Sequence, residues 1–392
     1  MARNLSSIIN FEGLASDRAE WKKFARVLFL GLLVPWVFLI ALAEWIAFQV
    51  GADMSPKAAA RLQTDHPNVI WYGYRSSSFG LFKLARVAID RPEILIVGQS
   101  RPQTFRSAMF RPYTAYNLGS ISYTMTSFTD LLRHLPEGYN PKVIIMACDW
   151  YLFDPVSTKA NIQQNMLQDF TPWQIDYITT LRDIFTVIPN HPWLLLAGLP
   201  QSDHRQFIGL GAYTMHMGFR KDGSTHWYRE SGPDNPKMAE MNPWRGFKTI
   251  QGDSLGKEEV AQFEQFVSEA HARGIAIVCV QLPMYTPAVE MMEHDKGANF
   301  GILRDFQNRV TNGYFDHLGV LAFDYLSFPG YSNDYHYFLD VVHPKEGLAL
   351  AVMNKMASDP RFLKILPKLD VADLQQKLKE DRTGSHYNVY GE

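Results

Sequence analysis

The segment that most constrains the fold is Ile94–Arg101, in which four apolar residues run directly into Gly98-Gln99-Ser100. Such an uninterrupted apolar run, rich in β-branched residues, is typical of a short strand buried on both faces of a parallel sheet. Gly98 allows a tight turn at its end, and a helix that tolerates Pro102 in its first turn is expected beyond. The pattern predicts a serine hydroxyl at the carboxyl edge of the sheet, where open α/β folds bind ligands. Taken alone, the motif favours a serine that only caps this helix.

Strands and helices alternate along most of the chain after residue 90. The apolar patterns predict further strands over 113–119, 143–148, 275–280 and 320–323, with helices over 123–135, 257–273, 300–318 and 345–356. This order implies right-handed crossovers with helices on both faces of the sheet. We therefore predict an α/β fold, a three-layer, doubly wound, parallel sheet of five strands, over residues 91–356.

Residues 149–256 interrupt this alternation and are rich in Trp, Tyr, Pro, Gly and His. A connection of this length is far longer than usual, so we predict an inserted cap over the sheet edge that shapes a substrate groove. His216, His226, Trp227 and Tyr228 in the insert would line a polymer groove, because aromatic faces stack on sugar rings. A packed cap core explains the same residues more simply.

Residues 24–48 form a nearly uncharged apolar stretch that is long enough to span a bilayer. The positive charges flank its amino-terminal side, which predicts that residues 1–23 are cytoplasmic and that everything after Gly51 is outside the cytoplasm, as in a single-pass inner-membrane protein. Ala41-Leu42-Ala43 resembles a signal-peptidase site, so a cleaved signal peptide is the alternative. Residues 49–90 are expected to form a stem, and 357–392 a charged tail that is helical around 369–380.

Composition narrows the classes of partner and site. The formal charge of −2 gives no basic field for nucleic acid. Cys148 and Cys279 lie in predicted strands and are expected as buried thiols, with a bridge as the lesser alternative. The histidines and carboxylates have no metal-like spacing, so we predict no metal and no cofactor.

Asp340 and His343 stand three residues apart, directly before the last predicted helix. A histidine that takes a proton from a serine hydroxyl must be held in one tautomer, and a neighbouring carboxylate does this. The spacing also occurs by chance, in which case the pair is a surface Asp and a helix-capping His. Ser100, Asp340 and His343 are nevertheless our candidate catalytic residues.

The order of Gly98-Gln99-Ser100, Asn117-Leu118-Gly119 and Asp340-Val341-Val342-His343 resembles the SGNH (GDSL-type) hydrolase superfamily. Together with the amino-terminal apolar helix and Arg101, it is similar to the membrane-anchored DltD-like proteins of cell-wall D-alanylation and to the alginate acetylation proteins. The resemblance implies Ser100 as nucleophile, His343 as base and Asp340 as its orienting group. It also implies an oxyanion hole of the Ser100 and Gly119 amides. In place of the usual third-block Asn, this chain has Asp149, so either Asn117 serves as the third donor or that donor is absent.

The resemblance further implies transfer of an acyl group to a cell-surface glycan or wall polymer beside a membrane-bound O-acyltransferase. Arg101 would hold an anionic acceptor or carrier, or would form a salt bridge at a helix start. The alternatives are a carbohydrate esterase and a non-catalytic docking subunit of such an acyltransferase.

Overall fold

The computed structural model describes residues 13–52, 54–73, 77–161, 183–190, 192, 207–227, 254–294, 300–381 and 389–390. The chain divides into two units, residues 1–53 with 175–200 and residues 54–174 with 201–392, which are described separately. Tyr228 and most of the remaining insert lie outside the described residues.

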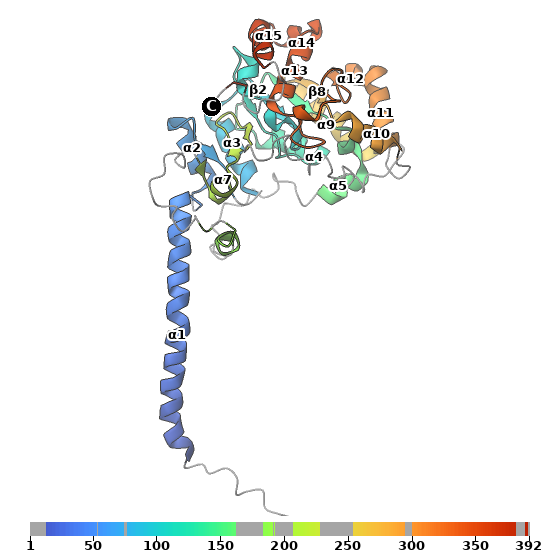
Figure 1. Cartoon of the computed structure of the whole chain (residues 1–392). Coiled ribbons are helices and arrows are strands. Elements are labelled where there is room, and N and C mark those ends of the chain that lie inside the picture. Colours follow the sequence, from blue (N-terminus) through green and yellow to red (C-terminus); the bar gives the residue numbers. More distant parts are fainter. Residues whose placement is uncertain are drawn as a thin grey trace, which may run out of the picture. The chain divides into compact units, whose positions relative to one another are not determined.

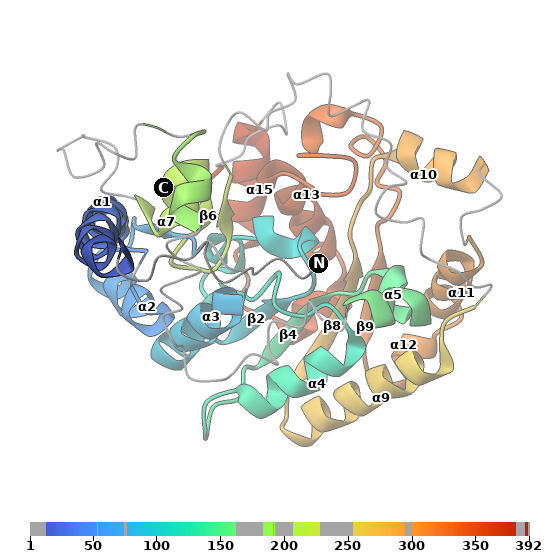
Figure 2. The same ribbon diagram turned by 90° about the horizontal axis from the view of Figure 1, so that it is seen from below.

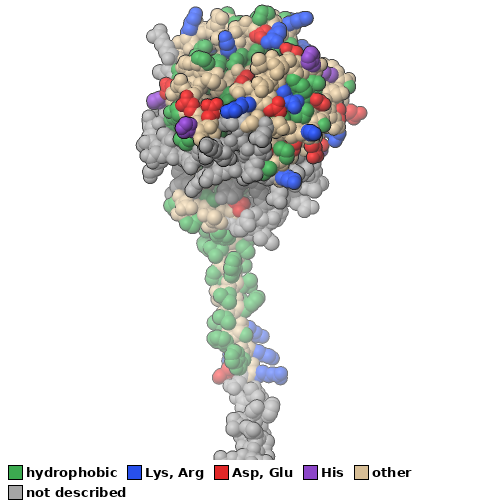
Figure 3. Space-filling view, turned by 90° about the vertical axis from the view of Figure 1, so that its right-hand side faces the viewer, with side chains coloured by type: hydrophobic (Ala, Val, Ile, Leu, Met, Phe, Trp, Pro, Cys, Tyr) green, Lys and Arg blue, Asp and Glu red, His purple; other side chains and the backbone are tan. Residues whose placement is uncertain are grey.

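The first unit contains one long helix, α1 (Gly13–Val50), which includes Pro35 (Figure 1). Its stretch Glu20–Val50 is long and apolar enough to cross a membrane, and an 18-residue segment within it has a mean hydropathy of 2.4. Apolar side chains cover this helix, and the cations Lys22, Lys23 and Arg26 gather at its amino-terminal end (Figure 3). The apolar helix expected over residues 24–48 is therefore present, within a longer one.

The second unit is built on a five-stranded sheet in which every neighbouring pair is parallel. The expected parallel sheet of five strands is confirmed. Its order is β3 (Ala115–Asn117), β2 (Ile94–Val97), β4 (Val143–Ala147), β8 (Ala276–Gln281) and β9 (Leu321–Asp324). In chain order this is 2-1-3-4-5, the order of flavodoxin-like sheets, whose ligands bind at the carboxyl edge beside the first strand.

Side chains alternate between the two faces of the sheet, and each face is covered by helices (Figure 2). Leu95 and Ile144 belong to the cluster with α4 (Met125–His134), α9 (Lys257–Ala272), α11 (Phe300–Thr311) and α12 (Tyr314–His317). Ile94 and Val143 belong to the cluster with α13 (Glu346–Met356), α14 (Pro360–Ile365) and α15 (Val371–Glu380). Because both faces are covered, uninterrupted apolar strands are what this sheet requires.

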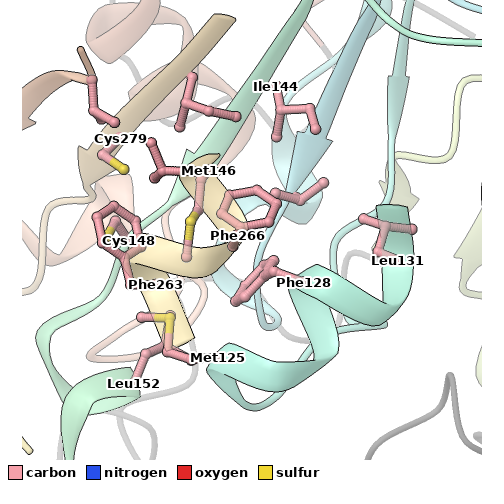
Figure 4. Close-up of a cluster of buried hydrophobic side chains, with 14 of the residues drawn as sticks. Met125, Phe128, Leu131, Ile144, Met146, Cys148, Leu152, Phe263, Phe266 and Cys279 are labelled. Carbon is pink, nitrogen blue, oxygen red and sulfur yellow. The ribbon is translucent and has the colours of Figure 1, made fainter. Parts of the chain in front are cut away.

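Figure 4 shows the first of these clusters, in which Phe128 of α4 and Phe266 of α9 lie against the strands. Their ring centroids are 5.8 Å apart. Cys148 and Cys279 are buried in the same cluster, and both are free. The expectation of two buried thiols is confirmed.

Two predicted helices differ from the structure. After Ser100 the chain forms two short 3-10 helices, η1 (Arg101–Thr104) and η2 (Ser107–Phe110), because the carbonyls of Pro102 and Phe105 accept hydrogen bonds from a side chain on β3. The helix expected over 300–318 is divided into α11 and α12 at Gly313, whose φ of 75° suits glycine.

The expectation of a stem over 49–90 is wrong for residues 56–90, which fold into the second unit. They form α2 (Pro56–Asp65), β1 (Ile70–Trp71) and α3 (Ser77–Asp90). Strand β1 lies within a small second sheet, between insert strands β5 (Phe207–Ile208) and β6 (Gly218–Phe219), and β7 (Thr225–His226) completes the order β5-β1-β6-β7. The rings of Trp71, Phe82 and Phe219 pack between this sheet and α3. Part of the insert therefore shares a core with residues that precede the main sheet.

The remaining described elements are η3 (Trp150–Phe153), α5 (Pro155–Asn161), α7 (Leu210–Met215), α10 (Thr286–His294) and η9 (Tyr335–Tyr337). The tail is helical over Val371–Glu380, as predicted, and Leu374 of this helix is buried in the core.

Candidate active site

Ser100 lies just beyond the carboxyl end of β2, in the tight turn that its sequence predicts. Gly98 has φ 150°, and a Cβ there would lie 2.8 Å from Cβ of Ala147 on neighbouring β4. Any larger residue would push the two strand ends apart. The close approach required of Gly98 thus fixes where the serine emerges from the sheet.

Ser100, His343 and Asp340 form one hydrogen-bonded chain across 243 residues of sequence. Ser100 Oγ lies 2.6 Å from Nε2 of His343. Nδ1 of the same ring lies 2.7 Å from Oδ2 of Asp340. The structure therefore brings together all three residues that the sequence nominates, in the relative order of a nucleophile, a base and an orienting carboxylate.

Asp340 is held in place by its own loop. Its Oδ1 accepts hydrogen bonds from the backbone N–H groups of Val342 and His343, both at 2.9 Å. Burial raises the pKa of this carboxyl, but His343 and the two N–H donors outweigh burial and lower it below its usual value. Asp340 is thus an ionised acceptor at neutral pH, and it selects the His343 tautomer whose Nε2 is free to accept the Ser100 proton.

The expectation that Asn117 donates to an oxyanion is wrong. Both hydrogens of its amide are used, because Nδ2 donates to the carbonyls of Pro102 at 2.7 Å and Phe105 at 2.9 Å. Its Oδ1 accepts the N–H of Gly119 at 2.8 Å. The Gly119 amide, the second expected donor, is therefore also committed within the loop, and Asn117 instead pins the turn after Ser100.

The expectation that Arg101 binds substrate is wrong as well. Its side chain is 1% exposed and forms a buried ion pair with Asp149. The alternative of a salt bridge at the start of the helical turn is the one that the structure supports. Asp149, at the end of β4, is fully buried beside this guanidinium and accepts the Tyr151 hydroxyl at 2.7 Å.

A cavity of about 420 Å³ opens beside Ser100 and His343. Most of its wall is aromatic or otherwise apolar, from Tyr72, Phe79, Tyr123, Met217, Phe219 and Trp227, and its polar members include Gln103, Ser120 and Thr225. The insert thus contributes directly to the site, and the Trp227 ring centroid lies 6.4 Å from that of His343. Of the other insert residues singled out by sequence, His216 and His226 face Phe207 with ring centroids 5.5 and 5.9 Å away.

Lys83 of α3 contacts the site, although no pattern in the sequence marks it as a site residue. Its fully buried Nζ donates to the carbonyls of Asn117, Gly119 and Gly223 at 3.1, 2.7 and 2.9 Å. Asn117 ends β3, Gly119 lies in the turn that follows it, and Gly223 belongs to the insert. Lys83 therefore ties Gly223, in the connection between insert strands β6 and β7, to the segment beside the nucleophile.

Among the described residues, no group of three or more His, Cys, Asp or Glu side chains is arranged to hold a metal ion. No family model, curated protein or solved structure matches this chain. The assignment of chemistry to the site therefore depends on its geometry and on the motif resemblance.

Proposed function

We propose that this protein is a membrane-anchored serine acyltransferase or esterase of SGNH type. The observation that carries the proposal is the 2.6 Å contact between Ser100 Oγ and His343 Nε2, with Asp340 behind the same ring. A serine hydroxyl becomes a useful nucleophile when a neutral, oriented imidazole accepts its proton. The cavity beside the pair supplies space for a substrate far larger than an acetyl group.

The proposed reaction has two balanced steps. Ser100 Oγ attacks the carbonyl carbon of a donor ester or thioester while His343 takes the hydroxyl proton. The imidazolium returns this proton to the departing alcohol or thiol, and an acyl ester remains on Ser100. An acceptor hydroxyl then attacks this ester, gives its proton to His343, and leaves acylated as Ser100 recovers the proton. Water in place of the acceptor gives hydrolysis.

The acceptor that we propose is a hydroxyl of a cell-surface glycan or wall polymer. This part of the proposal rests on the motif resemblance, as does the partner, a membrane-bound O-acyltransferase. The aromatic wall of the cavity is compatible with a sugar ring. We further propose that α1 holds the protein in the inner membrane with its amino terminus in the cytoplasm, because the cations lie at that end.

Labelling with a fluorophosphonate probe tests the nucleophile directly. The wild type is expected to react, Ser100→Ala is expected to be unreactive, and the control Ser358→Ala, at an exposed serine outside the site, should react like the wild type. If neither the wild type nor the control is labelled, the serine mechanism is refuted and the docking role is favoured.

Intact-protein mass spectrometry after incubation with acyl esters distinguishes the two enzymatic outcomes. An added acyl mass on the wild type, absent from Ser100→Ala, would show the covalent intermediate. Addition of glycan oligosaccharides should then remove the acyl mass faster than buffer alone if the protein is a transferase. Equal rates would identify an esterase.

A further inference from the structure

Arg101 donates four hydrogen bonds from a buried position directly after the nucleophile. Its Nε donates to the carbonyl of Val342 at 3.0 Å, and its Nη2 donates to the carbonyls of Leu282 and Pro283 at 2.6 and 2.7 Å. Its Nη1 donates to Asp149. The guanidinium thus joins the loops that follow β4 and β8 to the loop that carries His343.

Two of the residues in these contacts are direct chain neighbours of the two reacting residues. Arg101 is bonded to Ser100, and Val342 is bonded to His343. The Arg101 Nε–Val342 carbonyl hydrogen bond therefore joins the same two chain segments as the Ser100 Oγ–His343 Nε2 hydrogen bond. A displacement of the His343 loop away from Ser100 would have to break both. The planar, forked guanidinium suits such a role because it can donate to several fixed acceptors at once.

Asp149 completes this arrangement from the opposite side. It is fully buried, and its carboxylate also accepts the Tyr151 hydroxyl at 2.7 Å and lies 3.4 Å from Nε2 of Gln281. Its charge compensates the buried guanidinium and holds its orientation. Asp149, which follows β4, thus binds the Arg101 guanidinium and does not contribute to an oxyanion hole.

We propose that Arg101, oriented by Asp149, is a positioning residue that holds His343 at proton-transfer distance from Ser100. This inference rests on the proposed serine chemistry and adds a device to it. A loss of position of about 1 Å at a reacting pair can lower a rate by about 10²-fold. Because Arg101 is not among the residues that line the cavity, its removal should lower kcat and leave KM nearly unchanged.

The test uses the full-length protein and a charge-balanced variant, Arg101→Met/Asp149→Leu, so that no unpaired charge is buried. We expect a cooperative melting transition, a kcat for ester turnover about 10²-fold lower, and a KM within about twofold of the wild type. In the single variant Arg101→Ala, guanidinium ions should restore at least tenfold more activity than urea at the same concentration. Urea has a similar shape but no charge, so it controls for cavity filling.

A folded double variant that keeps at least a third of the wild-type kcat would overturn the inference, as would a loss confined to KM. If the double variant fails to fold, Arg101→Lys decides the matter. It keeps the charge beside Asp149 but cannot reach all four acceptors, so an unchanged kcat would refute positioning.

A readout independent of turnover separates this inference from the proposed function. The downfield proton resonance of His343 Nδ1–H, held by Asp340, should be sharp in the wild type and broadened or lost in the double variant. If Ser100 is unreactive but the His343 resonance still differs between the wild type and the double variant, the serine mechanism is refuted and the positioning inference stands. If Ser100 reacts but the resonance is identical in both proteins, the positioning inference is refuted and the serine mechanism stands.

Discussion

Replacement of Asp340 by asparagine tests whether the Asp340 carboxylate sets the tautomer of His343, because asparagine has nearly the same shape but no charge. Asn Oδ1 can still accept the N–H groups of Val342 and His343, which both donate to a single oxygen of Asp340. The other oxygen, 2.7 Å from His343 Nδ1, becomes an NH₂ group that donates instead of accepting. Nδ1 must then be the unprotonated nitrogen, so the proton moves to Nε2, which can no longer accept the proton of Ser100.

The expected loss follows from this tautomer change. In serine hydrolases with the same arrangement, the exchange lowers kcat by about 10⁴-fold, or about 5 kcal/mol of transition-state stabilisation. The fold should change little, because the two backbone hydrogen bonds of Asp340 remain and one charge-assisted bond is lost, at about 1–3 kcal/mol. Catalysis should therefore fall far more than the free energy of unfolding.

The assay is single-turnover acylation by a chromogenic ester, with melting temperature measured on the same samples. Asp334→Asn is the matched control, because Asp334 contacts the His336 ring at 2.8 Å in the same loop but both side chains are mostly exposed. It should keep the wild-type rate. If Asp340→Asn acylates within tenfold of the wild type, or if both variants lose activity equally, the assigned roles are refuted.

Four further outcomes are expected. Lys83→Met leaves three carbonyls without their donor and should lower the free energy of unfolding by about 3 kcal/mol, measured by denaturant titration. Burial raises the pKa of Asp222, but Arg106 and Arg220, together with hydrogen bonds from Ser224 and Ser107, outweigh burial and hold that pKa below its usual value. The stability that this carboxylate contributes is therefore complete above about pH 4 and is lost as the pH falls through its lowered pKa. Asp222→Asn should thus lower the free energy of unfolding at pH 7 and lower it progressively less towards pH 2. Acid-unfolding curves measure this difference. Trp227→Ala should raise KM for aryl or glycosyl esters with kcat within threefold in steady-state assays, because its ring lines the cavity without a place in the hydrogen-bonded chain. The full-length protein should remain with membranes after a high-salt wash, and its release with a new amino terminus at Glu44 would show cleavage of a signal peptide instead.

The sheet could be predicted because its strands carry a local signal. Residues 94–97, 143–147 and 276–281 are almost wholly apolar, as strands buried on both faces must be, and chirality restricts how helices connect them. Ser100 and the Asp340–His343 pair could be nominated for similar reasons, since a strand end and a spacing of three residues are both visible in sequence. Their convergence to 2.6 Å is a property of the folded chain.

The errors concern side chains whose partners are distant in sequence. The carbonyl acceptors of Arg101 lie 181, 182 and 241 residues away, and nothing near Arg101 marks a preference for them over a ligand. Asn117 was misassigned because an amide next to a nucleophile looks equally suited to an oxyanion and to turn carbonyls. The stem was misassigned because β1 has only two residues, too few for a periodic pattern, and gains its partners from the insert more than 130 residues later.

Two buried cations flank the nucleophile, and their contacts give them a common physical purpose. Lys83 and Arg101 each donate to three backbone carbonyls, most of them in loops at the carboxyl edge of the sheet or in the insert. Carbonyls in such loops have no ladder partner, and leaving them buried and unpaired is costly. A single cation satisfies three of them at once and thereby ties together segments that no strand pairing joins.

Burial lowers the pKa of Lys83 well below its usual value, although Asp222 opposes the shift, whereas Arg101 has Asp149 in direct contact. The Arg101 cluster is thus the better compensated of the two, and it is the one that holds the loop of His343, where a small displacement costs most in rate. Lys83 holds Gly223 of the insert, and other insert residues line the cavity. We therefore expect alkaline pH to loosen this part of the insert before it disturbs the Ser100–His343 contact, so that KM rises at high pH while the rate of Ser100 phosphonylation stays constant.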